Sequence, residues 1–264
     1  MKIENIDINI DKVVNIAIGA GKDILKIYQQ DSFDQQLKLD KSPLTEADIA
    51  SHNLITSQLQ KITPNVPILS EESKKIPWNV RKSWSMYWLI DPLDGTKEFI
   101  KKNGEFTVNI ALIHKNDPII GVVHAPVLGK TWVGERGKPA VKIGQGIITT
   151  IKTVPYIKKE ICKVVASRSH TGDSLHKFLQ GLGGYQLIPI GSSIKLCLVA
   201  EGEAHIYPRL GLTSEWDTAA AHAVVNSAGG EVLEFETKIP LKYNTKDSLL
   251  NPYFIVQDKL NSLL

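Results

Sequence analysis

The chain has 264 residues, of which 31 are Lys or Arg and 28 are Asp or Glu, giving a formal net charge of +3. This small charge argues against nucleic acid as a partner, and 42% hydrophobic residues is ordinary for a globular protein. No apolar run approaches the roughly 20 residues that span a bilayer, which argues against integral membrane contact.

The start of the chain also lacks the profile of a signal peptide. The two cysteines, Cys162 and Cys197, lie in apolar surroundings and are expected to be buried thiols of a reducing compartment. The sequence therefore predicts a cytoplasmic protein. Peripheral association with the inner membrane stays open, as does the choice between monomer and homodimer.

Two helices are expected near the N-terminus. Apolar residues recur at helical spacing over Ile8–Tyr28, which predicts an amphipathic helix. A second helix is expected over Ile49–Lys61, with Thr45 as its N-cap and Asp48 in its first turn. Asp48 is either part of an ordinary capped helix start or an acidic group facing a metal site. In the second case, Lys38 or Lys41 would approach an anionic substrate.

The most informative stretch runs from Trp88 to Ile100. Its apolar start predicts a buried strand, which we expect to end at Asp91 because proline follows. Asp94 is expected at the N-cap of the next helix. Two carboxylates this close repel each other unless a cation lies between them, and Mg²⁺ prefers oxygen ligands. The amides of a helix start favour phosphate, so the pattern predicts phosphoryl chemistry. The alternative is a turn residue followed by a plain cap.

Two further acidic positions are candidates for the same site. The short strand Val66–Ser70 leads into Glu71 and Glu72, whose side chains should point in opposite directions, so that one is a ligand. The alternative is a solvated acidic loop. Asp217 stands at the start of a helix expected over 219–227, where it is either a cap or a third carboxylate of the cluster.

The remaining elements divide the chain into two predicted domains. Alternating apolar residues over 105–113, 119–124 and 131–134, with a turn at Asp117-Pro118, predict an antiparallel meander; weaker strands follow at 141–143 and 147–154. Beyond residue 155, strands at 163–166 and 186–190 alternate with helices at 173–180 and 192–200, which predicts an α/β arrangement. We expect residues 1–154 to hold most metal ligands and residues 155–264 to complete the site.

Several separated motifs resemble those of the inositol monophosphatase superfamily: Glu71-Glu-Ser73, Asp91-Pro-Leu-Asp-Gly-Thr96 and Trp216-Asp217. The stretches 94–100, 103–109, 167–170, 191–195 and 207–209 look like its branch that acts on nucleotide bisphosphates. The resemblance covers about residues 10–251. It implies an α/β (α+β) fold, a layered α/β/α/β/α sandwich of the inositol monophosphatase/fructose-1,6-bisphosphatase type. It also implies a Mg²⁺-dependent, lithium-sensitive phosphomonoesterase.

The resemblance also implies roles for individual residues. Thr96 and Asp48 match the pair that orients the attacking water, with Glu71 beside them. The residues that match the ligands of two or three Mg²⁺ ions are Glu71, Asp91, the carbonyl of Leu93, Asp94 and Asp217. The residues that match the substrate site are Glu71, Leu93, Asp94, Gly95, Thr96, Ser193, Lys195, Arg209 and Asp217.

The implied reaction is hydrolysis of the 3'-phosphate of adenosine 3',5'-bisphosphate to AMP and phosphate. Arg209 favours this substrate because a guanidinium attracts a second phosphate, where inositol-specific relatives have a glutamate. Arg168 and His170 are further candidates for phosphate contact. The alternative for His170 is a residue at a helix start, and the alternative for Lys195 is a solvated lysine. The alternatives are an inositol monophosphatase or other sugar phosphatase of the same superfamily, and a non-catalytic nucleotide-binding protein.

Overall fold

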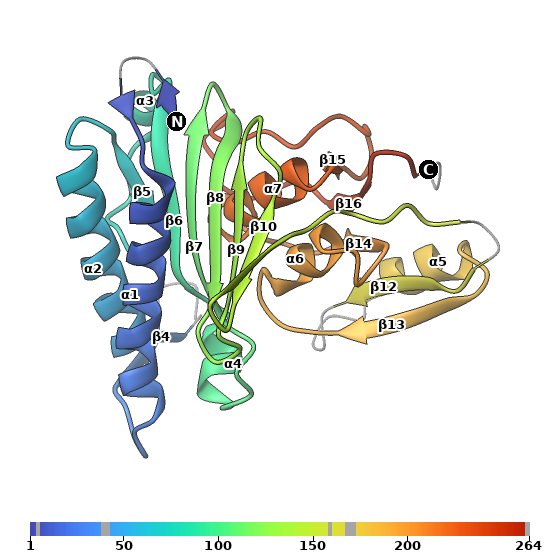
Figure 1. Cartoon of the computed structure of the whole chain (residues 1–264), viewed down its shortest axis with the longest axis horizontal. Helices are drawn as coiled ribbons and strands as arrows, with labels where there is room; N and C mark the ends of the chain where they lie inside the picture. The colour runs from blue at the N-terminus through green and yellow to red at the C-terminus, as the bar shows by residue number, and fades with distance from the viewer. Residues whose placement is uncertain (4–5, 38–42, 158–159, 167–172, 262–264) are drawn as a thin grey trace.

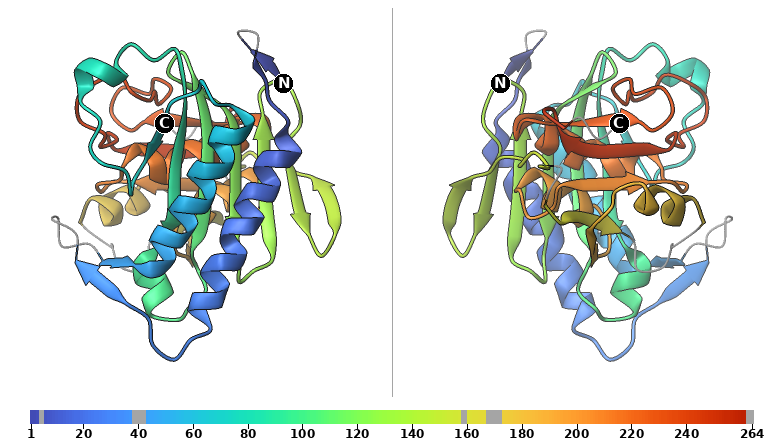
Figure 2. Two further views of the ribbon diagram at one scale, coloured as in Figure 1. Left: turned by 90° about the vertical axis from the view of Figure 1, so that its left-hand side faces the viewer. Right: turned by 90° about the vertical axis from the view of Figure 1, so that its right-hand side faces the viewer.

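The computed structural model of the protein describes residues 1–3, 6–37, 43–157, 160–166 and 173–261. These residues form a seven-stranded sheet, in the order β11-β10-β9-β8-β7-β6-β5, and a five-stranded sheet, in the order β13-β12-β14-β16-β15. Helices α1 and α2 cover the outer face of the larger sheet, α6 and α7 lie between the sheets, and α5 covers the far side (Figures 1 and 2). The layers thus follow the predicted α/β/α/β/α order.

The elements have the following bounds. The helices are α1 (Ile10–Tyr28), α2 (Glu46–Ile62), α3 (Trp78–Arg81), α4 (Thr96–Ile100), α5 (Asp173–Gln180), α6 (Ile194–Ala200) and α7 (Glu215–Ser227). The strands of the larger sheet are β5 (Ile68–Ser70), β6 (Met86–Asp94), β7 (Thr107–His114), β8 (Asp117–Ala125), β9 (Lys130–Glu135), β10 (Val141–Gly144) and β11 (Ile147–Thr150). Those of the smaller sheet are β12 (Cys162–Ala166), β13 (Tyr185–Pro189), β14 (Ile206–Arg209), β15 (Gly230–Glu234) and β16 (Phe254–Asp258). Two short pairs, β1 (Lys2–Ile3) with β2 (Ile6–Asp7) and β3 (Gln35–Leu37) with β4 (Pro43–Thr45), complete the list.

The larger sheet separates two hydrophobic cores because side chains alternate between its faces. Along β6, Trp88 and Ile90 enter the core shared with α1 and α2, whereas Tyr87 and Leu89 enter the core shared with α6 and α7. Both faces are covered by helices, so the central strands are buried throughout. The expected strands over 105–113 and 119–124 correspond to β7 and β8, and they pair antiparallel as predicted.

Three local predictions were wrong. Strand β6 does not end at Asp91 but continues to Asp94. The pairing with β7 is irregular between these residues, so no ladder hydrogen bond requires the amide proton that Pro92 lacks. The N-cap of α4 is Gly95, with a left-handed φ of 93°, and not Asp94. The turn before β8 lies at Lys115 and Asn116, with φ of 50° and 66°, so the predicted turn residues Asp117 and Pro118 open the strand instead.

Other expectations are matched at least in part. Thr45 is the N-cap of α2 as predicted, but α2 begins at Glu46 and not at Ile49, and α7 begins at Glu215 and not at Ala219. Cys162 and Cys197 are buried free thiols. Among the described residues, no helix combines the length and the apolar character needed to cross a membrane. The domain boundary at residue 154 stays a prediction.

Candidate metal and phosphate site

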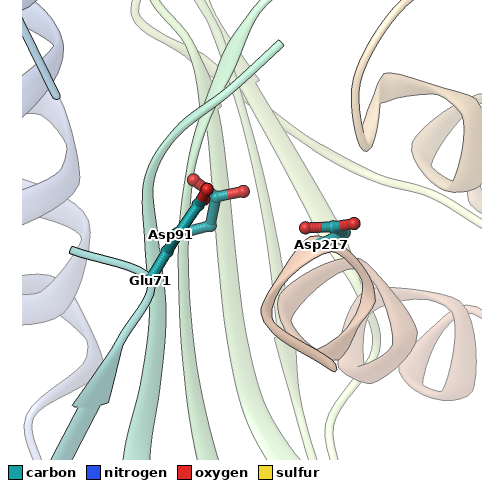
Figure 3. Close-up of side chains that lie close together, drawn as sticks. All are labelled: Glu71, Asp91 and Asp217. Atoms are coloured by element: carbon teal, nitrogen blue, oxygen red, sulfur yellow. The ribbon is translucent and has the colours of Figure 1, made fainter. Parts of the chain in front are cut away.

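Three carboxylates from distant parts of the chain meet at one edge of the larger sheet. Glu71 follows β5, Asp91 lies in β6, and Asp217 lies in the first turn of α7. One carboxylate oxygen from each lies within 4.8 Å of the others. Figure 3 shows Glu71 and Asp91 side by side, with Asp217 facing them from its helix. We call these residues the carboxylate cluster.

Regular backbone pairing holds two of the three carboxylates together. Strand β5 pairs parallel with β6, and the amide of Glu71 donates to the carbonyl of Ile90 at 3.2 Å, so Glu71 emerges beside Asp91. Asp91 accepts a hydrogen bond from the amide of Leu93 at 3.0 Å, within the bulge. Asp217 is held by a capping box, in which the Ser214 amide donates to its Oδ2 at 2.9 Å.

The cluster carries more negative charge than its surroundings balance. Burial raises the pKa of Asp91 well above its ordinary value, and Glu71, Asp94 and Asp217 raise it further. Burial likewise raises the pKa of Asp217, with Asp94 and Glu71 adding to the effect and Arg209 opposing it. Carboxylates held together against this repulsion form a set suited to a hard divalent cation.

Asp94 is not one of the three residues whose carboxylate oxygens lie within 4.8 Å of one another, although its charge acts on both Asp91 and Asp217. Its Oδ2 accepts a hydrogen bond from the amide of Ser193 at 2.5 Å, across 99 residues of sequence. Burial raises the pKa of Asp94 to about 6, while Lys195 and the Ser193 amide act in the opposite direction. Asp94 therefore connects the end of β6 to the loop before α6.

Thr96 and Asp48 contact each other, although they lie on different helices. The Thr96 hydroxyl donates to Asp48 Oδ1 at 3.3 Å and lies 3.4 Å from the carbonyl oxygen of Leu93. The other oxygen of Asp48 accepts from the amide of Thr45 at 2.8 Å and from its hydroxyl at 2.5 Å. Both polar groups are thus fixed beside the bulge of β6.

A pocket adjoins the cluster on the side of α6. Its lining includes Asp94, Gly95, Ser193, Lys195, Arg209 and Asp217. Lys195 is buried, and this burial lowers its pKa to about 8 although Asp94 favours the charged form. Arg209 donates to the carbonyl of Leu212 at 2.8 Å, while its buried Nε has no hydrogen-bond partner among the described residues. Two cationic groups therefore stand beside a concentration of carboxylates.

Sequence reasoning missed the residues that hold the loop before α6. Glu105 accepts from the amide of Gly191 at 2.8 Å, and Asn109 accepts from the hydroxyl of Ser193 at 2.7 Å. Thr107 Oγ1 lies 2.8 Å from the same hydroxyl. The signal available in the sequence is the presence of two polar residues, Thr107 and Asn109, in an otherwise apolar strand. Their register partners on β6 are Asp94 and Asp91, respectively.

Ser51 was also missed. It lies on the buried face of α2, and its hydroxyl donates to the carbonyl of Pro92 at 2.7 Å. This bond fixes the bulge from the side of α2. The remaining candidates, Lys38, Lys41, Arg168 and His170, lie outside the residues that the structure describes.

Comparison with known proteins gives a consistent result. Residues 9–264 match the sequence model of the inositol monophosphatase family. The 3'(2'),5'-bisphosphate nucleotidase CysQ of Salmonella typhimurium is 48% identical over 248 residues, which cover 94% of this chain and 98% of that protein. The enzyme of the same name from Escherichia coli is 49% identical with the same coverage.

Solved structures agree with the sequence matches. The structure of CysQ from Bacteroides thetaiotaomicron, described as a bacterial member of the inositol monophosphatase family, is 40% identical and superposes with a TM-score of 0.83. The match covers 94% of this chain and 96% of that one. An inositol monophosphatase from Anabaena, at 24% identity and a TM-score of 0.74, shares the fold.

Proposed function

This chain belongs to the inositol monophosphatase family, and from that premise we propose that it hydrolyses the 3'-phosphate of adenosine 3',5'-bisphosphate to AMP and phosphate. One observation carries the choice of substrate: the pocket beside the carboxylate cluster contains two cationic side chains, Lys195 and Arg209. The nucleotidases named above, which share almost half of their residues with this chain, support the same reaction.

The carboxylate cluster suits Mg²⁺, the cation proposed here. The family is metal-dependent, and Glu71, Asp91 and Asp217 offer only oxygen atoms, which Mg²⁺ prefers. We assign these three residues, with Asp94 and the carbonyl of Leu93, to two or three Mg²⁺ ions. When bound, the metal neutralises negative charge and lowers the pKa of water, so that hydroxide is available near neutral pH.

Thr96 and Asp48 are assigned to the attacking water. Because the Thr96 hydroxyl donates to Asp48, its oxygen lone pairs are free to accept a hydrogen bond from that water. In this step Thr96 passes its hydroxyl proton to Asp48 and receives a proton from the water. Thr96 therefore stays neutral, and Asp48 becomes protonated. Glu71, at the same edge of the sheet, is assigned to the same step.

The other lining residues bind the substrate in this proposal. Glu71, Leu93, Asp94, Gly95, Thr96 and Asp217 surround the phosphate that is cleaved. Ser193, Lys195 and Arg209 hold the second phosphate of the nucleotide. The position of Arg209 in the pocket lining supports this assignment, because a guanidinium binds phosphate through paired, charge-assisted hydrogen bonds.

The test is phosphate release from adenosine 3',5'-bisphosphate with Mg²⁺, measured with and without lithium, beside inositol 1-phosphate. We expect fast, Mg²⁺-dependent release from the nucleotide that lithium suppresses, with AMP as the other product. The Asp94→Asn variant should keep its fold and lose most turnover. A preference for the inositol ester would overturn the substrate assignment. No release from either ester would overturn the catalytic proposal and favour a binding protein.

A further inference from the structure

The carboxylate cluster contains side chains from two segments of the chain, and these side chains repel each other when charged. Glu71 and Asp91 belong to the larger sheet, whereas Asp217 belongs to α7. Their charges repel, as the raised pKa values of Asp91 and Asp217 indicate. Contacts elsewhere must therefore keep α7 at a fixed distance from the segment that contains Glu71.

The start of α7 does not pack closely against the segment that contains Glu71, because a cavity lies between them. One side of the cavity consists of residues that follow β5, including Glu71, Ser73 and Ile76. The opposite side includes Ser214, Trp216 and Leu249. Arg81 also lines the cavity, and it connects the two sides.

Arg81 is almost fully buried, with 1% of its surface exposed, although it carries a charge. Its Nη1 donates to Asn244 Oδ1 at 2.6 Å and to the carbonyl of Lys246 at 3.1 Å, and its Nη2 donates to the carbonyl of Asp247. In return, Asn244 Nδ2 donates to the carbonyl of Arg81 at 2.7 Å. The guanidinium thus binds the 244–247 loop through several bonds in fixed directions, which a lysine cannot reproduce.

The 244–247 loop continues this connection to α7. The amide of Asn244 donates to both carboxylate oxygens of Glu215, at 3.0 and 2.8 Å. Asn244 adopts a left-handed φ of 52° there. Glu215 is the first residue of α7, and its own amide donates to the carbonyl of Leu249 at 2.8 Å. The chain of contacts therefore ends two residues before Asp217.

The charges along this path offset each other in part. Glu215 is buried, and burial raises its pKa to about 7, while the Asn244 amide and Arg81 favour its charged form. Asp247 Oδ1 lies 3.6 Å from Arg81 Nη2 on the solvent side. A buried guanidinium needs such partners to offset its lost hydration. The path from α3 to α7 is thus a series of polar contacts beside the cavity, in which both terminal nitrogens of Arg81 are bonded and its buried Nε has no partner among the described residues.

We propose that Arg81 is a positioning residue for the carboxylate cluster. Through Asn244 and Glu215 it holds the start of α7 at the distance from which Asp217 reaches Glu71 and Asp91. The inference rests on the proposed function only in that the cluster binds Mg²⁺. Arg81 itself touches neither metal nor substrate in this role.

The test compares Arg81→Met and Arg81→Lys with a control that destabilises the protein elsewhere. Ile24→Ala suits this purpose, because Ile24 is fully buried in α1, on the outer face of the larger sheet. Mg²⁺ affinity is measured by calorimetry on folded protein. We expect Arg81→Met to weaken binding by about 10- to 100-fold, Arg81→Lys to weaken it less, and Ile24→Ala to leave it unchanged. Equal affinity in Arg81→Met and wild type would overturn the proposal.

A second readout needs no metal. Hydrogen exchange of the Glu215 amide, in the presence of a chelator, reports how firmly the start of α7 is held. We expect exchange to accelerate in Arg81→Met and not in Ile24→Ala. If wild-type protein fails to bind Mg²⁺, the metal assignment is wrong, while this experiment still tests the connection. Unchanged exchange in Arg81→Met would show that Arg81 does not position α7.

Discussion

Gly121 in β8 lies against the carbonyl oxygen of Ala220 in α7, so closely that a β-carbon at Gly121 would overlap that oxygen. Gly134 in β9 repeats the arrangement: its added β-carbon would lie 2.5 Å from the carbonyl oxygen of Ala223. The missing side chains let α7 rest directly on the backbone of the sheet. Because α7 also contains Asp217, these glycines set the height of that carboxylate above the sheet.

We therefore predict that Gly121→Ala destabilises the protein by about 3 kcal/mol or more, since the backbone of α7 cannot yield as a side chain would. Urea unfolding measures this loss. The matched control is Gly144→Ala, because a β-carbon there meets nothing closer than 3.9 Å. Equal stability of the two variants would contradict the packing argument. Folded Gly121→Ala protein should also bind Mg²⁺ more weakly, since α7 is displaced.

The sequence was sufficient to predict the strands of the larger sheet, whereas the order of the layers came from the family resemblance. Three strands of the smaller sheet, β14, β15 and β16, were not predicted. Apolar runs mark the strands because both faces of the central sheet are buried, and helical spacing marks α1 and α2. The bulge in β6 was not predictable, because Pro92 signals the end of a strand unless an irregular pairing accommodates it. The contacts of β6 with β7 and with Ser51, which are distant in sequence, support the bulge.

The candidate site was predictable in part for a similar reason. Carboxylates beside strand ends and helix starts stand out in a sequence, and Glu71, Asp91 and Asp217 do lie together. The bond from Ser193 to Asp94 joins residues 99 positions apart, so no local pattern reveals it. The burial of Arg81 was likewise not predictable, because its partner Asn244 lies 163 residues away in the sequence.

Removing one carboxylate of the cluster should stabilise the metal-free protein. In Asp217→Asn, the side-chain oxygen can still accept from the Ser214 amide, while the repulsion with Asp94 and Glu71 disappears. We expect the free energy of unfolding at pH 8, with chelator, to rise by about 1 kcal/mol or more. The stabilisation that Mg²⁺ gives to wild-type protein should be lost in this variant.

Thermal unfolding with chelator and with excess Mg²⁺ measures both effects. Asp23→Asn is a suitable control, because Asp23 pairs with Lys26 at 2.6 Å within α1, on the outer face of the larger sheet (Figure 1). It should leave the Mg²⁺ response intact. If Asp217→Asn lowered the stability of the metal-free protein, electrostatic repulsion would not be what governs the cluster.

The hydroxyl of Thr96 is expected to matter for turnover more than for binding. Thr96→Ala removes the group that donates to Asp48, and we predict a decrease in kcat of about 10²- to 10⁴-fold with little change in KM. Thr96→Ser keeps the hydroxyl and should retain most activity. Steady-state kinetics with adenosine 3',5'-bisphosphate measures both variants. Similar losses in the Ala and Ser variants would show that the methyl group, through packing, is what the site requires.

His222 should make the protein sensitive to acid. Burial lowers the pKa of His222 to about 3 from its ordinary 6.5, and its Nδ1 lies 2.9 Å from the hydroxyl of Tyr243. Below pH 6.5 the unfolded chain binds a proton at this residue that the folded protein does not, so stability falls as the pH falls. At pH 5 the loss is about 2 kcal/mol, since each pH unit contributes about 1.4 kcal/mol.

The measurement is urea unfolding of wild type and His222→Asn at pH 7.5 and pH 5. The difference in stability between the two pH values should be about 2 kcal/mol smaller in the variant. Contributions from the carboxylate cluster cancel, because both proteins contain it. The control is His176→Asn, since His176 is exposed in the folded protein as in the unfolded chain. An unchanged pH dependence in His222→Asn would assign the acid sensitivity to other groups.

Arg209 should discriminate between nucleotides with one and two phosphates. If its guanidinium binds the second phosphate, Arg209→Met should lower kcat/KM for adenosine 3',5'-bisphosphate by about 10- to 100-fold, as expected for a lost charged hydrogen bond. Activity on adenosine 3'-monophosphate should hardly change, because that ester lacks the group that Arg209 binds. The ratio of the two kcat/KM values is thus the decisive measurement.

A second role of Arg209 competes with this interpretation, and the same ratio separates the two. Arg209 donates to the carbonyl of Leu212, so it also holds the loop that leads to α7 and Asp217. A loss of that support would impair both substrates equally, because the proposed function assigns Asp217 to the cleaved phosphate, which both share. Equal losses would therefore assign Arg209 to the loop. A selective loss on the bisphosphate, partly restored in Arg209→Lys, would assign it to the second phosphate.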